Sequence, residues 1–151
     1  MLEVLSAEGL RALLADWQPL RGLNLAGGDY RGVDLSNARL EDVDARGAQF
    51  NGAMLTQSYW KDCRLDGANF SDSTADSLYM NACSLQGASF MNVRWNKTSW
   101  VQCHGEDLDL SGAQLQAFTL SERRVPRVRL AAAQLSKSQW SRCDLTGLDA
   151  Q

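Results

Sequence analysis

A large apolar residue recurs at every fifth position along most of this chain. The series includes Leu25, Tyr30, Leu35, Leu40, Phe50, Leu55, Trp60, Leu65, Phe70, Met80, Leu85, Phe90, Trp95, Trp100, Leu110, Leu115 and Leu120. An α-helix would scatter residues at this spacing around its axis, and a β-strand would place them on alternating faces. A fixed short period over the whole chain is typical of stacked repeats. The sequence therefore predicts a solenoid.

The other positions of the five-residue unit support this period. The residue two places before most apolar centres is small, as at Ala48, Ala68 and Ala88, and glycine often follows two places after the centre. The units Gly-Val-Asp-Leu-Ser at 32–36 and Gly-Ala-Asn-Phe-Ser at 67–71 show the pattern most clearly. Each unit therefore directs one large and one small side chain toward an interior.

This pattern resembles the pentapeptide-repeat family, whose consensus is A(D/N)LXX. The resemblance extends over roughly Leu20 to Ala150. It implies an all-β solenoid, a right-handed quadrilateral parallel β-helix in which four units form one coil. Residues 20–151 would then form about six to seven coils of a single domain.

The N-terminal segment, residues 1–19, lacks this period. Leu10, Leu13, Leu14 and Trp17 have the spacing of one helix face, Ser6 can cap the helix and Pro19 marks its end. We expect the segment to form a capping α-helix that covers the first coil, because the open end of a solenoid exposes its core.

Composition favours a soluble protein. Hydrophobic residues make up 44% of the chain, but no run approaches the ~20 apolar residues of a membrane span. The N-terminus lacks a basic segment followed by an apolar one, as a secretion signal would have. We expect a cytoplasmic protein with no membrane partner.

Writing the sequence with four units to a row places four cysteines in one column: Cys63, Cys83, Cys103 and Cys143. Stacked neighbours about 4.8 Å apart miss the ~3.8 Å Cβ separation that a disulfide prefers. The column also lacks the tetrahedral convergence of a zinc site. We expect buried, reduced thiols and neither metal nor cofactor.

Catalytic groups are sparse. The only histidine, His104, follows Cys103, and alternation along the strand places the two side chains on opposite faces. The repeated glycines form neither a G-x-G-x-x-G pattern nor a phosphate loop. We expect no enzymatic activity, which leaves the outer surface as the place of function.

Three surfaces are candidates for binding a partner protein. Arg39, Tyr59 and Tyr79 share an outward column, and both residue types are enriched where proteins meet. The column can equally be a cross-strand ladder that only stabilises the sheet. We keep both interpretations.

The second candidate lies in residues 121–130, where Arg123 replaces a small inward residue and Pro126 lacks a backbone donor. We expect this coil to be distorted or to loop outward, because an unpaired buried arginine is costly. Arg123, Arg124, Arg127 and Arg129 would then form a basic patch for an acidic partner, or only a loose coil with solvated arginines. Nucleic-acid binding usually requires a broader basic face.

The third candidate is the C-terminal end of the rod. No amphipathic segment follows the last repeats, so Leu145 and Leu148 could contact a partner. We expect end-to-end association there, with a homodimer as one form of it. The alternative is that the final turn covers itself.

The resemblance implies two functions. The degenerate units with tryptophan and cysteine are similar to those of adaptor proteins associated with bacterial secretion systems. The alternative is a quinolone-resistance protein, which mimics DNA with an acidic rod that binds a type II topoisomerase such as DNA gyrase. Residues 1–120 hold 15 acidic and 9 basic residues, whereas a duplex about 30 Å long carries about 18 phosphate charges. The charge balance therefore favours the adaptor.

Overall fold

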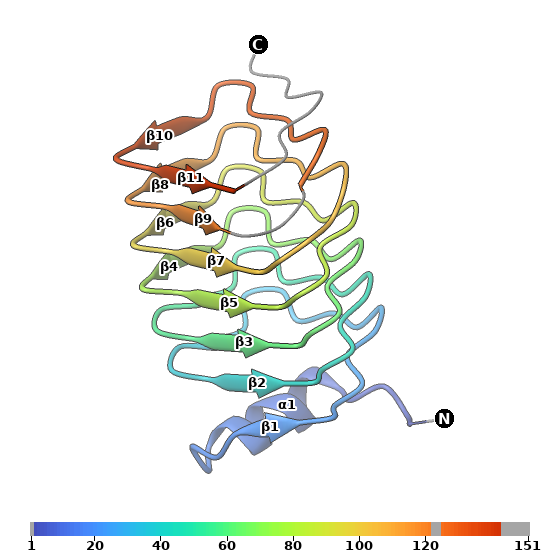
Figure 1. Cartoon of the computed structure of the whole chain (residues 1–151). Helices are drawn as coiled ribbons and strands as arrows, with labels where there is room; N and C mark the ends of the chain where they lie inside the picture. Colours follow the sequence, from blue (N-terminus) through green and yellow to red (C-terminus); the bar gives the residue numbers. More distant parts are fainter. Residues whose placement is uncertain (1, 122–124, 143–151) are drawn as a thin grey trace.

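The computed structural model describes residues 2–121 and 125–142 as a stack of coils with one short helix at its N-terminal end (Figure 1). The elements are α1 (Ala7–Leu14), β1 (Leu20–Arg21), β2 (Arg39–Glu41), β3 (Tyr59–Lys61), β4 (Thr74–Asp76), β5 (Tyr79–Asn81), β6 (Arg94–Asn96), β7 (Ser99–Val101), β8 (Gln114–Gln116), β9 (Thr119–Ser121), β10 (Gln134–Ser136) and β11 (Gln139–Ser141). The predicted parallel β-helix is confirmed, with about six coils.

Two of the four faces of the rod are regular parallel sheets. One has the order β1-β2-β3-β5-β7-β9-β11, and the other has the order β10-β8-β6-β4. The remaining two faces are joined by isolated parallel bridges such as Asp44↔Arg64 and Gln49↔Asn69. Each residue pairs with the one that holds the same place in the next coil, as in Leu40↔Trp60, so equivalent side chains form columns.

Each five-residue unit ends in a corner residue with positive φ. Glycine occupies many corners, for example Gly52 with φ 69°, but Ala82 adopts φ 54° and Asp62 adopts the same angle. The left-handed region is the one that glycine enters without steric cost. This explains why glycine recurs two places after the apolar centre.

The core contains an aromatic column that runs through four coils. Tyr30, Phe50, Phe70 and Phe90 stack with ring centroids 5.4, 5.0 and 5.4 Å apart. Trp60 packs edge-on against Phe50 and Phe70, at 5.7 and 5.9 Å. All five side chains are buried, so the rod is filled by its own large apolar residues.

The cysteine column lies inside the rod, as predicted. Cys63, Cys83 and Cys103 are buried and free, and each Sγ lies 3.5 Å from the carbonyl oxygen of the residue 23 positions earlier. The neighbouring Cys83 thiol and burial both raise the pKa of Cys63. Cys143 lies outside the described residues.

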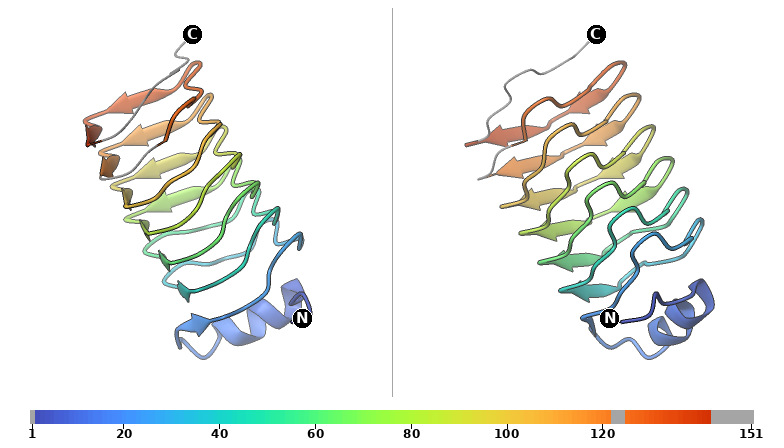
Figure 2. Two further views of the ribbon diagram at one scale, coloured as in Figure 1. Left: turned by 45° about the vertical axis from the view of Figure 1, so that its right-hand side comes forward. Right: turned by 90° about the vertical axis from the view of Figure 1, so that its right-hand side faces the viewer.

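The N-terminal helix lies against the first coil (Figure 2). The Ser6 Oγ accepts a hydrogen bond from the Gly9 backbone N–H at 3.0 Å, as the cap prediction required. Leu10 is fully buried, and the Leu5 N–H donates to the Asn24 carbonyl at 2.9 Å. These contacts attach the helix to the solenoid.

The prediction that Trp17 shares the buried helix face is wrong. The helix ends at Leu14, and the chain then turns, so that Trp17 has φ 56° and is 75% exposed. Gln18 precedes Pro19, and a residue before proline is disfavoured in the helical region. The helix therefore ends too early for Trp17 to reach the core.

The described part of the arginine-rich segment keeps the register of the stack. Val125, Val128 and Leu130 are buried, and the Leu110 N–H donates to the Arg129 carbonyl at 2.8 Å. Residues 125–130 therefore do not loop outward. The predicted contact residues Arg123, Arg124, Leu145 and Leu148 lie outside the described residues.

Candidate interaction surfaces

Arg39, Tyr59 and Tyr79, here called the tyrosine face, lie together on the outside of the seven-stranded sheet. Strand pairing brings Tyr59 beside both Arg39 and Tyr79. The two rings stack 5.4 Å apart with their planes 4° from parallel. The Arg39 Cζ lies 5.1 Å from the Tyr59 ring centroid, within cation–π range. The sequence correctly predicted that these three residues meet.

Glu41 holds the arginines at one end of the tyrosine face. Its two carboxylate oxygens accept from the Nε atoms of Arg39 and Arg21, each at 2.7 Å. The hydrogen bond from Arg39, with a smaller contribution from Arg21, holds the pKa of Glu41 below its usual range. At the other end, the register neighbour of Tyr79 is the small residue Ser99. The stack of outward aromatic rings therefore ends at Tyr79, beside the small side chain of Ser99.

A groove of about 410 Å³ continues the tyrosine face toward the N-terminal helix. Its lining includes Leu14, Trp17, Pro19, Asp34 and Arg39. Arg39 belongs to both surfaces and joins the groove beside Trp17 to the tyrosine face, and we call the two together the strip. The helical spacing predicted that Trp17 shares the covered face of the helix, so an exposed indole was not expected here.

Exposed apolar side chains gather near the N-terminal end of the described chain. Of the six exposed large hydrophobic residues in the described chain, four precede residue 20, namely Leu2, Val4, Leu13 and Trp17, and the other two are Met54 and Met91. Trp17 is the most exposed of them, at 75%. Exposed apolar side chains that cluster mark interaction sites more often than scattered ones do.

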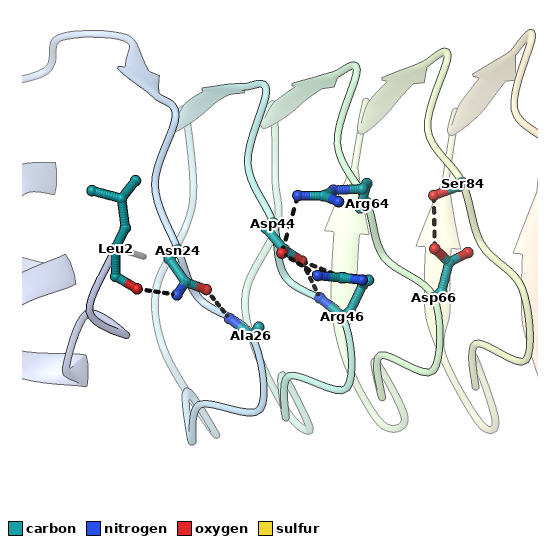
Figure 3. Close-up of polar contacts among 8 residues, drawn as sticks. All are labelled: Leu2, Asn24, Ala26, Asp44, Arg46, Arg64, Asp66 and Ser84. Carbon is teal, nitrogen blue, oxygen red and sulfur yellow. Dashed lines mark hydrogen bonds and ion pairs between the residues drawn. The ribbon is translucent and has the colours of Figure 1, made fainter.

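A neighbouring face carries charges that are satisfied within the chain (Figure 3). The Asp44 carboxylate accepts from Arg46 Nη2 at 2.7 Å and from Arg64 Nη2 at 3.1 Å. In the next coil, Asp66 accepts from the Ser84 hydroxyl at 3.0 Å. The Arg64–Asp44 and Ser84–Asp66 contacts join successive coils, whereas the Arg46–Asp44 pair lies within one coil. All of these groups are therefore paired within the chain rather than free to bind a partner.

The described arginines of the 121–130 segment have different surroundings. Arg127 donates through Nε to Asp107 at 2.7 Å and also pairs with Glu106. These two carboxylates raise the pKa of the Arg127 guanidinium. Arg129 is exposed and bridges to Asp109 through the backbone. Carboxylates of its own chain therefore compensate the charge of Arg127.

The unpaired carboxylates do not form one stripe. The five arginines between residues 20 and 79 all make ion pairs, namely Arg21, Arg31, Arg39, Arg46 and Arg64. Within the described residues, the carboxylates left without an ion pair in that range are Asp34, Asp42, Asp62, Asp66, Asp72 and Asp76. Because they lie on different faces and corners, the negative potential is spread around the rod.

The described residues contain no arrangement typical of catalysis. His104 is exposed whereas Cys103 is buried, so the two do not pair. No group of three or more His, Cys, Asp and Glu in the described chain could hold a metal ion. The same residues include no helix that is long and apolar enough to cross a membrane.

Comparison with known proteins identifies the repeat. Residues 20–90 match the model for the pentapeptide repeat region. Full-length QnrB1, a plasmid-mediated fluoroquinolone resistance protein, is 18% identical over 87% of this chain and 84% of its own, with a TM-score of 0.46. Rfr23 from the cyanobacterium Cyanothece 51142 is 17% identical over 95% of this chain and 94% of its own, with a TM-score of 0.36. No curated protein matches the sequence. With its five-residue units stacked in coils, this chain contains a pentapeptide repeat region over residues 20–90.

Proposed function

We propose that this chain is a non-enzymatic adaptor that binds another protein through the strip formed by Trp17 and the tyrosine face. The observation that carries the proposal is the shared position of Arg39, which contacts Tyr59 and also lines the groove beside Trp17. Tryptophan, tyrosine and arginine are the residues that most often dominate binding energy at protein interfaces. Here all three lie on one surface.

The rigidity of the strip supports this function. Stacking fixes the two tyrosine rings, and Glu41 fixes the Arg39 guanidinium. Side chains that are already ordered lose little conformational entropy when a partner binds. A purely stabilising ladder would explain the tyrosines but not the exposed indole of Trp17, which makes no contribution to the core.

The test is capture of the partner with defined surface variants. The wild-type chain and an Arg39→Ala/Tyr59→Ala variant are used as baits in an extract of the native cell, and captured proteins are identified by mass spectrometry. We expect the variant to lose the partner. The matched control is Arg31→Ala/Gln49→Ala, which changes an arginine and a neighbouring polar residue away from the strip.

If both variants capture the same proteins equally well, the strip is not the binding surface. Circular dichroism and thermal melting of both variants must match the wild type, so that loss of binding does not reflect loss of fold. We further propose that the chain is an accessory of a bacterial secretion system and acts in the cytoplasm. The buried free thiols are consistent with a reducing compartment.

A second candidate function is mimicry of DNA toward a type II topoisomerase. The observation in its favour is the set of carboxylates without an ion pair between residues 20 and 79, which gives that region an excess of negative charge. A supercoiling assay with purified DNA gyrase, with and without a quinolone, tests it. Unchanged supercoiling and unchanged drug inhibition at tens of micromolar protein would exclude this function.

A further inference from the structure

A groove on the four-stranded sheet presents side-chain amides and a guanidinium. It has a volume of about 400 Å³ and crosses β6, β8 and β10. Its outward side chains are Arg94, Asn96, Gln114, Gln116, Gln134 and Ser136, and we call it the amide groove. The largely buried Trp95 and Leu115 form its floor.

The polar groups of this groove are mostly uncommitted. Arg94 makes no ion pair with any described residue, unlike each arginine between residues 20 and 79. In the same part of the chain, the side chains of Gln114, Gln116 and Gln134 make no hydrogen bond. Asn96 is the exception, because its Nδ2 lies 3.4 Å from Asp76 Oδ1 at one border of the groove.

The charge of the amide groove also differs from that of the other grooves described. The groove beside Trp17 includes Asp34, and a third groove, which adjoins the amide groove and shares Arg94 and Gln114 with it, includes Asp72. A fourth, near the N-terminus, includes Asp42 and Asp44. The amide groove has a cation in its lining and no carboxylate. Exposed lysines occupy the adjoining corners at Lys97 and Lys137. Its charge is therefore complementary to an anion.

We propose that the amide groove binds an extended acidic segment of polypeptide. Glutamine amides both donate and accept hydrogen bonds, which matches the alternating N–H and C=O groups of an extended backbone. The Arg94 guanidinium accommodates a carboxylate, to which it can donate two parallel hydrogen bonds. Neighbouring strands lie about 4.8 Å apart, so the groove spans the length of about three extended residues.

The same features argue against nucleic acid as the occupant. Proteins that bind single strands combine a cationic groove with aromatic side chains on which bases stack. The amide groove has one guanidinium in its lining, and its only aromatic residue, Trp95, is 1% exposed. This site is on a different sheet from the tyrosine face, so it does not depend on the function proposed above.

The probe for this proposal is a short, end-blocked glutamate homopeptide carrying a fluorophore, titrated with the full chain at pH 7 and low salt. Charge repulsion keeps such a peptide extended. We expect saturable binding, followed by fluorescence anisotropy. Arg94→Gln should weaken it about tenfold, the usual scale for losing a charged hydrogen bond. Gln114→Glu, which adds a carboxylate to the groove, should weaken it at least as much.

The control variant is Arg31→Gln, at an arginine that pairs with Asp29 on another face. It should bind the peptide as the wild type does. Equal weakening by Arg31→Gln, or no binding by the wild type, would overturn the proposal. Polyacrylate carries carboxylates without a peptide backbone. Equal affinity for polyacrylate would show that charge attraction alone explains the binding, which would contradict recognition of an extended peptide. Tighter binding of single-stranded DNA would assign the groove to nucleic acid instead. Melting curves show whether each variant is folded. If Arg94→Gln does not fold, Gln114→Glu still tests the proposal.

Discussion

Tyr59 and Tyr79 stack on the outside of the rod at 5.4 Å, while Phe50 and Phe70 stack inside it at 5.0 Å. The same coil-to-coil register produces both pairs. The outer pair remains partly exposed, whereas the inner pair is fully buried. One repeat therefore places similar aromatic pairs in two environments, which differ in what each contributes to stability.

Removal of an inner ring should cost far more than removal of an outer one. Phe70→Ala leaves a cavity between Phe50 and Phe90, and we expect it to lower the free energy of unfolding by about 3–5 kcal/mol. Tyr79→Ala loses mainly one stacked contact, for which we expect about 0.5–1.5 kcal/mol. Urea denaturation measures both. Similar losses would show that the tyrosine face is as important to the fold as the core.

The corner residues predict opposite effects of alanine and glycine. Ala82 adopts φ 54°, so Ala82→Gly should stabilise the protein by about 1 kcal/mol, because glycine enters this region without strain. Gly52 adopts φ 69°, and an added Cβ would meet no neighbouring atom. Gly52→Ala should therefore destabilise the protein by about 1 kcal/mol, because of the backbone conformation alone. Thermal melting of the pair tests this. A stabilising Gly52→Ala would contradict the assigned corner geometry.

The buried thiols should be inert in the folded protein. The Cys83 thiol and burial raise the pKa of Cys63, and a protonated thiol reacts slowly. The hydrogen bond with Cys83 lowers the pKa of Cys103, so the protection of Cys103 depends on its complete burial. We expect Cys63, Cys83 and Cys103 to escape modification by a disulfide reagent at pH 8 and to react after denaturation. Peptide mapping by mass spectrometry identifies the modified residues. Rapid labelling of Cys83 in the native protein would place the column at the surface.

Asp44 should make the free energy of unfolding depend on pH in the acid range. Arg46, and to a lesser degree Arg64, hold the pKa of Asp44 below its usual range. Its contribution is therefore complete above the unfolded-state pKa of about 3.9 and disappears as the pH falls through the folded-state value. Asp44→Asn should cost up to about 1 kcal/mol at pH 7 and progressively less as the pH falls through the folded-state pKa of Asp44.

The matched control for Asp44 is Asp62→Asn, at a carboxylate without an ion pair in the described chain. Denaturation curves at several pH values compare the two variants. A loss for Asp44→Asn that stays constant at all pH values would show that packing, and not charge, is responsible.

Trp17 should be dispensable for folding. It is exposed and adopts φ 56°, so Trp17→Gly should keep the stability or raise it by about 1 kcal/mol. The variant should also lose the part of the tryptophan emission that acrylamide quenches most easily. A loss above about 2 kcal/mol would instead make Trp17 a structural anchor of the helix.

The sequence predicted the features that follow directly from its period. The columns of Phe70, Cys83 and Tyr79 are at the predicted positions because each coil of four units repeats the one before it. The position of Trp17 was missed because it depends on where a short helix ends. The pairing of Arg127 with Asp107 was missed as well, since it depends on side-chain conformations that a backbone period does not determine.

The in-register pairing of the strands makes the outside of this rod a surface with fixed coordinates. Moving along the sequence by one full coil, as from Tyr59 to Tyr79, shifts a side chain by one strand spacing and leaves its direction unchanged. A surface side chain can therefore be moved by one strand spacing while the backbone around it stays equivalent. A recognition element on this rod can therefore be relocated, coil by coil, to measure how far along the axis a bound partner reaches.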